Sequence, residues 1–115
     1  MKLIRGLTDP ILSGAEKAVG ENWLDSFVAP ALDGYSKVIL SICPADECTI
    51  SLVMRPAGNE DEDAEEEIDL GVFPAETMTV VPEFLMHSNF EYNLRITDGV
   101  DSEIIYLGFA YTKTN

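Results

Sequence analysis

The chain is poor in the residue types that build most active sites and most nucleic-acid interfaces. Its 115 residues include one His, two Cys and one Trp, with 7 Lys and Arg against 21 Asp and Glu. Proteins bind nucleic acid largely through Lys and Arg that neutralise phosphates, so a net charge of −14 argues against direct DNA or RNA binding. The same charge predicts repulsion from anionic lipid surfaces. We therefore predict neither a nucleic-acid nor a membrane partner.

Long apolar runs are also missing. The longest, residues 38–42 and 104–110, are far shorter than the roughly 20 residues that a helix needs to cross a bilayer. The opening MKLIRGLTDP has two basic residues but no apolar stretch of signal-peptide length. We expect a soluble protein that stays in the compartment where it is made.

Catalytic and metal-binding motifs are absent from the sequence. His87 stands alone in a polar stretch with no adjacent nucleophile, and no Gly-rich phosphate loop, GxSxG, HExxH or paired CxxC occurs. Residues 59–63 lack the central glycine of an EF-hand loop. Structural zinc usually takes four ligands, whereas the soft candidates are only Cys43, Cys48 and His87. We predict a protein that is not an enzyme and that has no metal or other cofactor.

The two cysteines flank a short polar segment that resembles a hairpin loop. Residues 44–47 read PADE, between Cys43 and Cys48. Directly opposed hairpin residues lie about 4.5–5.5 Å apart at Cα, so a disulfide is geometrically possible. A reducing compartment instead favours two buried free thiols, which is the interpretation we prefer.

Acidic residues are concentrated in one place. The segment EDEDAEEE at residues 60–67 holds seven of the 21 acids. Because like charges cannot pair with one another, we expect residues 59–67 to form an exposed, mobile loop between two strands. The loop either keeps the protein soluble, grips a basic partner, binds divalent cations weakly or imitates a phosphate backbone. The seven acids are Glu60, Asp61, Glu62, Asp63, Glu65, Glu66 and Glu67.

From Tyr35 onward, apolar residues alternate with polar ones and turn signals interrupt the pattern. This alternation predicts strands near residues 36–42, 49–55, 68–73, 77–81, 92–97 and 103–112. The fourth strand is expected to end at Pro82, which has no backbone N–H to donate. The fold class predicted is all-β: a small antiparallel β-sandwich, jelly-roll-like, over residues 35–115.

Residues 1–34 differ from the rest because glycines and prolines interrupt every long element. We predict an extended N-terminal arm with short strand segments. The last strand is apolar on both faces, with Ile105, Leu107, Phe109 and Tyr111 on one face. One face is expected to fill the core, and the other to meet the arm or a neighbouring subunit. The predicted protein-interface residues are Leu3, Ile4, Leu7, Ile11, Leu12, Trp23, Phe27, Ile104 and Tyr106, with packing onto their own sandwich as the alternative for Trp23 and Phe27.

The sequence also resembles a family. The run SKVILSICPADECTISLVMRPAGN, a short acidic loop, IDLGVFPAETMTVVPEFLMHSNFEYNLRI and a closing SEIIYLGFAYT are similar to the small β-sandwich virion proteins of tailed bacteriophages. The resemblance covers about residues 35–112. Where the family has a Gly-Asp pair after the fourth strand, this chain has Ser88-Asn89.

The resemblance implies a structural role in a virion. The expected function is capsid decoration or cement, with the protein bound between subunits of the major capsid protein in several copies. A trimer, synthesis in the host cytoplasm and final location in the virion are part of this expectation. The alternatives are a neck or tail accessory protein, an acidic inhibitor that mimics nucleic-acid charge, and a small carbohydrate- or protein-binding β module.

Overall fold

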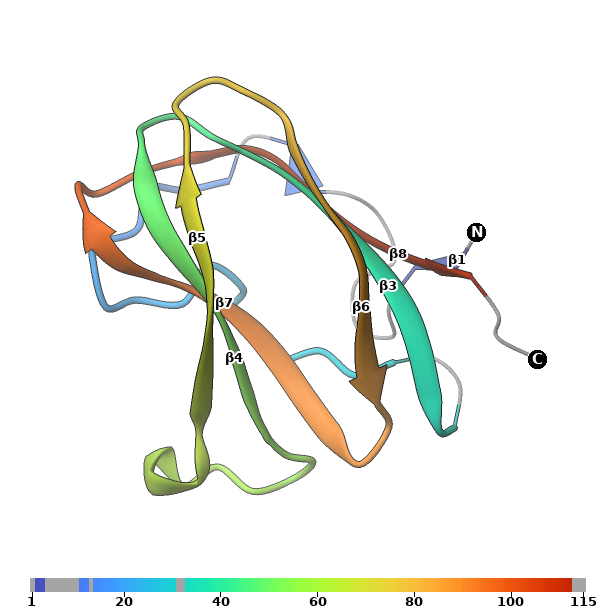
Figure 1. The fold of residues 1–115 in the computed structure, drawn as a ribbon. Coiled ribbons are helices and arrows are strands. Elements are labelled where there is room, and N and C mark those ends of the chain that lie inside the picture. The colour runs from blue at the N-terminus through green and yellow to red at the C-terminus, as the bar shows by residue number, and fades with distance from the viewer. Residues whose placement is uncertain (1, 4–10, 13, 31–32, 113–115) are drawn as a thin grey trace.

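The computed structural model describes residues 2–3, 11–12, 14–30 and 33–112. Within them the chain forms strands and one short 3-10 helix, η1 (Figure 1). The elements are β1 (Lys2–Leu3), β2 (Ile11–Leu12), β3 (Tyr35–Pro44), β4 (Cys48–Pro56), η1 (Glu62–Ala64), β5 (Glu66–Phe73), β6 (Thr79–His87), β7 (Phe90–Gly99) and β8 (Ile104–Thr112).

Two antiparallel sheets pack face to face. One has the strand order β1-β8-β3-β6, with β2 also paired to β8, and the other has the order β5-β4-β7. The predicted all-β sandwich is therefore confirmed. The strands also begin and end within a few residues of their predicted positions, except for β6.

The core lies between the sheets, because the alternate residues of each strand that point inward are apolar. Val38, Leu40 and Ile42 of β3 are fully buried, as are Leu107 and Phe109 of β8. They meet Ile50 and Leu52 of β4 and Leu94 and Ile96 of β7 in one cluster. Each such side chain contributes about 1.5–3 kcal/mol by leaving water, so this cluster is the main stabilising feature of the domain.

The link between β3 and β4 is not a hairpin, contrary to the sequence prediction. β3 pairs with β6 and β8, whereas β4 pairs with β5 and β7, so residues 45–47 carry the chain from one sheet to the other. Cys43 lies opposite Tyr106, and Cys48 lies opposite Phe73 and Gly99. Both cysteines are buried free thiols, which confirms the preferred interpretation.

Two further predictions fail at β-bulges. β6 continues through Pro82 to His87, because the register against β3 shifts between Val38 and Leu40 and accommodates the missing N–H. In β8 the register shifts where Pro44 pairs with Ile104 and Cys43 pairs with Tyr106. Ile105 is the extra residue there, and it is 44% exposed instead of sharing the core face with Leu107.

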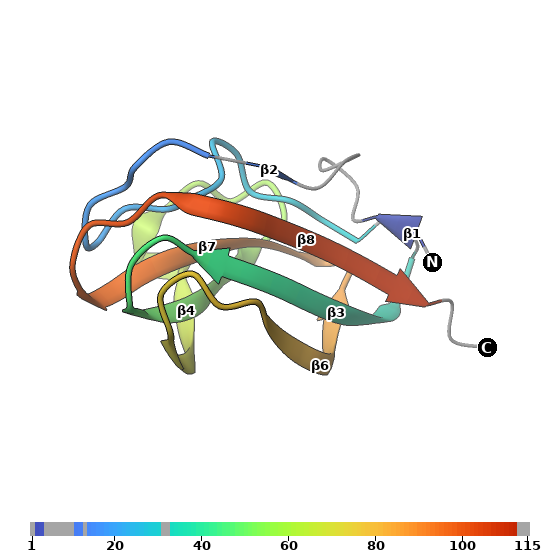
Figure 2. The same ribbon diagram turned by 90° about the horizontal axis from the view of Figure 1, so that it is seen from above.

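The described part of the N-terminal segment folds back onto its own sandwich. Isolated bridges join Lys17 to Ser102, Asn22 to Arg95 and Val28 to Tyr92. The segment therefore runs first beside β8 and then along β7, and it closes the side of the sandwich between these two strands (Figure 2). Trp23, Leu24 and Val28 belong to the core cluster.

Candidate functional site: two interaction surfaces

The outer face of the β8-β3-β6 sheet is apolar and exposed. Residues on this face alternate with the core residues, so that Leu12 and Cys43 flank Tyr106, Val80 lies beside Ser41, and Leu85 lies beside Lys37. Leu12 is 69% exposed, Val80 53% and Leu85 57%. We call this surface the apolar face, and its members are Leu12, Ile39, Val80, Leu85, Tyr106, Gly108 and Ala110.

Tyr106 lies flat along the apolar face. A Cβ built on Gly108 would sit 3.0 Å from the Tyr106 hydroxyl oxygen and 3.1 Å from its ring, so the ring covers the glycine two positions further along. An aromatic ring laid over a strand glycine shields the backbone that the glycine leaves bare. The result is a smooth surface instead of a protruding side chain.

Charge is nearly absent from the apolar face. Of the residues whose side chains are described in these cross-strand rows, Lys37 is the one with a full charge, and none is acidic. The whole chain has a net charge of −14. Among the described side chains of this face, an approaching macromolecule therefore meets no carboxylate, whose burial without a partner would cost several kcal/mol.

The structure separates the predicted interface residues into groups. Trp23 and Ile104 are 6% and 3% exposed and pack in the core, so their prediction as intermolecular contacts is wrong. Burial within their own chain satisfies their apolar surface. Ile11 is partly buried against the core, whereas Leu12 and Tyr106 lie on the apolar face.

The remaining predicted interface residues, Leu3, Ile4 and Leu7, lie in or just after β1. Leu3 contributes its backbone to β1, opposite Ala110 of β8. Ile4 and Leu7 lie outside the described residues. The sequence analysis missed Ile39, Val80 and Leu85. Ile39 could have been found, because it alternates with the core residues Val38 and Leu40 and so lies on the opposite face of their strand.

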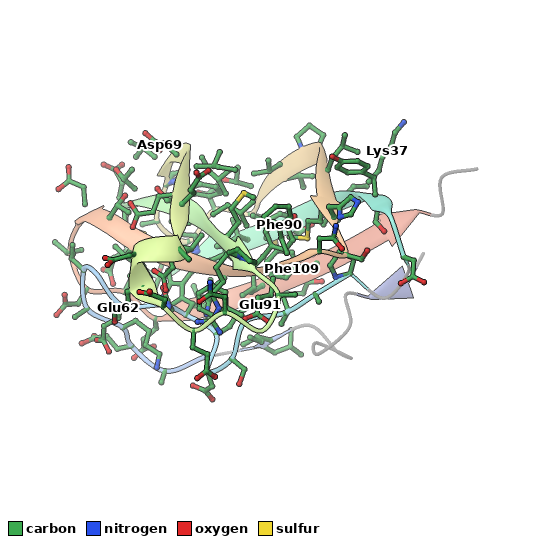
Figure 3. The ribbon with its side chains drawn as sticks, turned by 90° about the horizontal axis from the view of Figure 1, so that it is seen from below. Lys37, Glu62, Asp69, Phe90, Glu91 and Phe109 are labelled. Atoms are coloured by element: carbon green, nitrogen blue, oxygen red, sulfur yellow. The ribbon has the colours of Figure 1, made fainter. Side chains whose placement is uncertain are left out.

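The acidic run is more ordered than the sequence suggests. Residues 60–63 are exposed, among them Glu62 of η1, which is labelled in Figure 3. Asp61 caps η1 by accepting a hydrogen bond from the Asp63 N–H. Glu65 and Glu67 do not belong to a free loop. Their carboxylates accept hydrogen bonds from Arg95 of β7, both at 2.8 Å, so the prediction of one mobile acidic loop is wrong for this half of the run.

Arg95 holds the outer face of the β5-β4-β7 sheet together. Its Nε also donates to the Asn22 side-chain oxygen at 2.8 Å, so the guanidinium joins the acidic run to the N-terminal segment. Partial burial lowers the pKa of Arg95, but the hydrogen bonds and charges of Glu65 and Glu67 outweigh this effect and raise the pKa above its ordinary value.

A second arginine fixes Phe27 on the same face. The Arg55 Nε donates to Glu91 at 2.6 Å, and its guanidinium lies 3.7 Å from the centre of the Phe27 ring. In this cation–π contact Arg55 covers one side of the Phe27 ring, which is half-buried. The alternative that Phe27 packs on its own sandwich therefore describes this structure.

His87 takes part in local packing. Its Nδ1 accepts a hydrogen bond from the Asn89 N–H at 3.0 Å, and its ring packs edge-on against Tyr35 with ring centres 4.4 Å apart. No group of three or more His, Cys, Asp or Glu in the described part of the chain is placed to hold a metal ion. Among the residues that the structure describes, no helix has the length and apolarity to span a bilayer.

Comparison of the chain with family models, with curated proteins and with solved structures found no match. The case for a function therefore depends on the two surfaces: the apolar face on one sheet and the acidic edge of the other.

Proposed function

We propose that the protein is a non-enzymatic virion structural protein of a tailed bacteriophage, and that it decorates the capsid by binding between capsid subunits. The supporting observation is the apolar face. It is built on rigid strands, it contains three strongly exposed aliphatic side chains, and no acid is described on it. Exposed apolar patches of this kind are typical of protein–protein contacts.

The charge layout supports a protein partner and not a nucleic acid. Lys37 is the one charged side chain described on this surface and cannot neutralise several phosphates, and the chain as a whole is strongly acidic. Capsid subunits that present an apolar or weakly acidic surface are suitable partners, since Lys37 then meets an opposite charge at the rim of the contact. In this proposal several copies bind to one particle as trimers, and each copy uses the apolar face.

The acidic inhibitor gains less support from the structure. A mimic of nucleic acid needs its carboxylates available and spread over a long surface. Glu65 and Glu67 are instead paired with Arg95, which leaves residues 60–63 and Glu66 as the described acids of the run without an ion pair. A neck or tail accessory protein would use the same apolar face on a different virion subunit.

The first experiment determines whether the chain is a component of the particle. Virions of the phage that encodes the chain are purified by density gradient, and their proteins are quantified by mass spectrometry. The proposal expects this chain in a fixed ratio to the major capsid protein. Its absence from virions of intact infectivity would refute the proposal. A ratio of only a few copies per particle would instead favour the neck or tail.

The second experiment tests which face is used. The double variant Val80→Asp with Leu85→Asp places two charges on the apolar face, whereas Val72→Asp changes a residue that is 64% exposed on the other sheet. Capsids stripped of the protein are sedimented with each variant. We expect the double variant to bind more than about tenfold more weakly and the control to bind normally. Equal binding by both would exclude the apolar face.

A further inference from the structure

The outer strand β5 has one hydrogen-bonding edge that the described structure leaves unpaired. β5 pairs with β4 on one side, and within the described residues no strand pairs with its other side. An unpaired edge presents backbone N–H and C=O groups that can extend the sheet by another strand. Both edge strands have a bulge, at residues 82–83 of β6 and at Leu70 of β5. β6 also contains Pro82, which lacks the N–H that an added strand would need, whereas β5 contains no proline.

The apolar row at this edge is incomplete. Ile68 lies opposite the core residue Leu52 and therefore points toward the inside of the sandwich, yet it is 46% exposed. Met54 and Leu70, beside it, are only partly buried against the core. An apolar side chain from one added strand would complete the row at β5.

The charges at the edge determine which partner fits. Glu67 and Asp69 lie opposite Val53 and Ser51, so both are on the outer face of β5, and both are exposed. Glu66 lies opposite Met54, on the same face as Ile68, and the exposed acids of residues 60–63 come shortly before the strand. Asp69 projects from β5 in Figure 3. A second copy of β5 would place acids against acids, which destabilises cross-strand pairing. A strand with basic residues would instead gain opposite-charge pairs at the same positions.

We propose that the free edge of β5 binds an extended segment of another protein in which basic and apolar residues alternate. Its backbone pairs with β5, its apolar side chains cover Ile68 on the inner face, and its Lys or Arg side chains meet Glu67 and Asp69 on the outer face. This surface lies on the sheet that the proposed capsid contact does not use, so the inference goes beyond that function and does not depend on it.

The test uses an eight-residue probe, the length of β5, with Lys and Val alternating and both ends blocked. The probe is titrated into the full chain labelled with ¹⁵N, and amide shifts are followed by NMR. We expect the largest shifts along Glu66–Phe73. A probe in which Glu replaces Lys should not bind. A probe with N-methyl groups on alternate residues keeps its charge but cannot pair along that edge, and it should also fail to bind.

Matched variants separate the edge from general acidity. Glu67→Gln with Asp69→Asn removes two charges and retains acceptors for Arg95 and for the Gly71 N–H, which Asp69 now binds at 2.8 Å. We expect it to weaken binding of the Lys probe about tenfold. Glu16→Gln with Glu103→Gln removes two exposed charges beside β8 and should leave the affinity unchanged.

Three patterns of binding would overturn the inference: shifts confined to residues 60–63, equal binding of the N-methylated probe, and equal weakening by both double variants. Each would show that the probe is held by charge without strand pairing. Lack of binding by the Lys probe at millimolar concentration would overturn it as well. Shifts along β5 that require both the charges and the unmethylated backbone would support it.

Discussion

Replacing Asn93 with alanine should detach the N-terminal segment from β7. Asn93 is 1% exposed, and its side chain makes three hydrogen bonds. Its Oδ1 accepts from the N–H groups of Leu24 at 3.1 Å and Leu94 at 2.8 Å, and its Nδ2 donates to the Leu24 carbonyl at 3.0 Å. The asparagine therefore satisfies both backbone groups of Leu24 in a buried bend.

The size of the effect follows from these partners. In Asn93→Ala the buried N–H and C=O of Leu24 lose the side chain that binds them, and each unsatisfied group costs about 1–3 kcal/mol. We expect the free energy of unfolding to fall by about 2–5 kcal/mol, a large part of the roughly 5–15 kcal/mol that holds a typical domain folded. Urea denaturation followed by Trp23 fluorescence measures this loss.

Hydrogen exchange distinguishes local detachment from global unfolding. The N–H groups of Trp23 and Val28 donate to the carbonyls of Leu94 and Tyr92, both at 2.8 Å. If the segment detaches by itself, these two amides should exchange faster in Asn93→Ala while those of β3 and β8 remain protected. The control Asn89→Ala changes an exposed asparagine and should stay within about 0.5 kcal/mol of the original protein. A loss below about 0.5 kcal/mol in Asn93→Ala, with unchanged exchange, would refute this reasoning.

Three other predictions follow from single contacts. Arg95→Met removes both carboxylate contacts, so we expect a loss of about 1 kcal/mol and faster amide exchange over residues 62–67, and unchanged exchange would show that the pairing does not order the run. Burial, with the charges of two nearby acids, raises the pKa of Cys48 from 9.0 to about 11, so the unfolded state releases its proton first and stability should fall as pH rises from 9 toward 11. That loss is about 2 kcal/mol, and a Cys48→Ala variant with the same pH slope in denaturation would contradict it. Gly14→Ala places a methyl group against the Ile104 side chain, so it should lower stability by about 1–3 kcal/mol, and no change in melting temperature would mean that Ile104 moves aside at no cost.

The sequence predicted the strands well because their period is a local property. The alternation around Val38 and Leu40 identifies the core side of β3, and the same reasoning works for β4, β7 and most of β8. It failed at Ile105 and Pro82, where a bulge changes the parity or accommodates a missing donor. A bulge depends on the neighbouring strand, which is set by contacts far away in the sequence.

The candidate surfaces were harder to predict than the strands. Leu12 and Tyr106 were identified, but Val80 and Leu85 join them only because β6 pairs with β3 across forty residues of chain, and pairing partners are not encoded in alternation. Likewise, the contact of Glu65 with Arg95 brings together residues thirty positions apart. From the sequence alone, the acids of the run are expected to repel one another and to stay in solvent. The arginine that neutralises two of them belongs to another strand, so the run itself gives no sign of the pairing.

The position of the N-terminal segment bears on how the chain folds. Residues 11–28 pair only with β7, β8 and the turn between them, as far as the structure describes them, so they must wait for strands that are synthesised about 70 residues later. Until β8 is synthesised, Trp23 and Leu24 have no core to enter, and chaperones that bind apolar segments have access to them. We expect nascent chains stalled before residue 104 to be sensitive to protease throughout. Completion of β8 would then trigger folding of residues 11–28 together with β7 and β8.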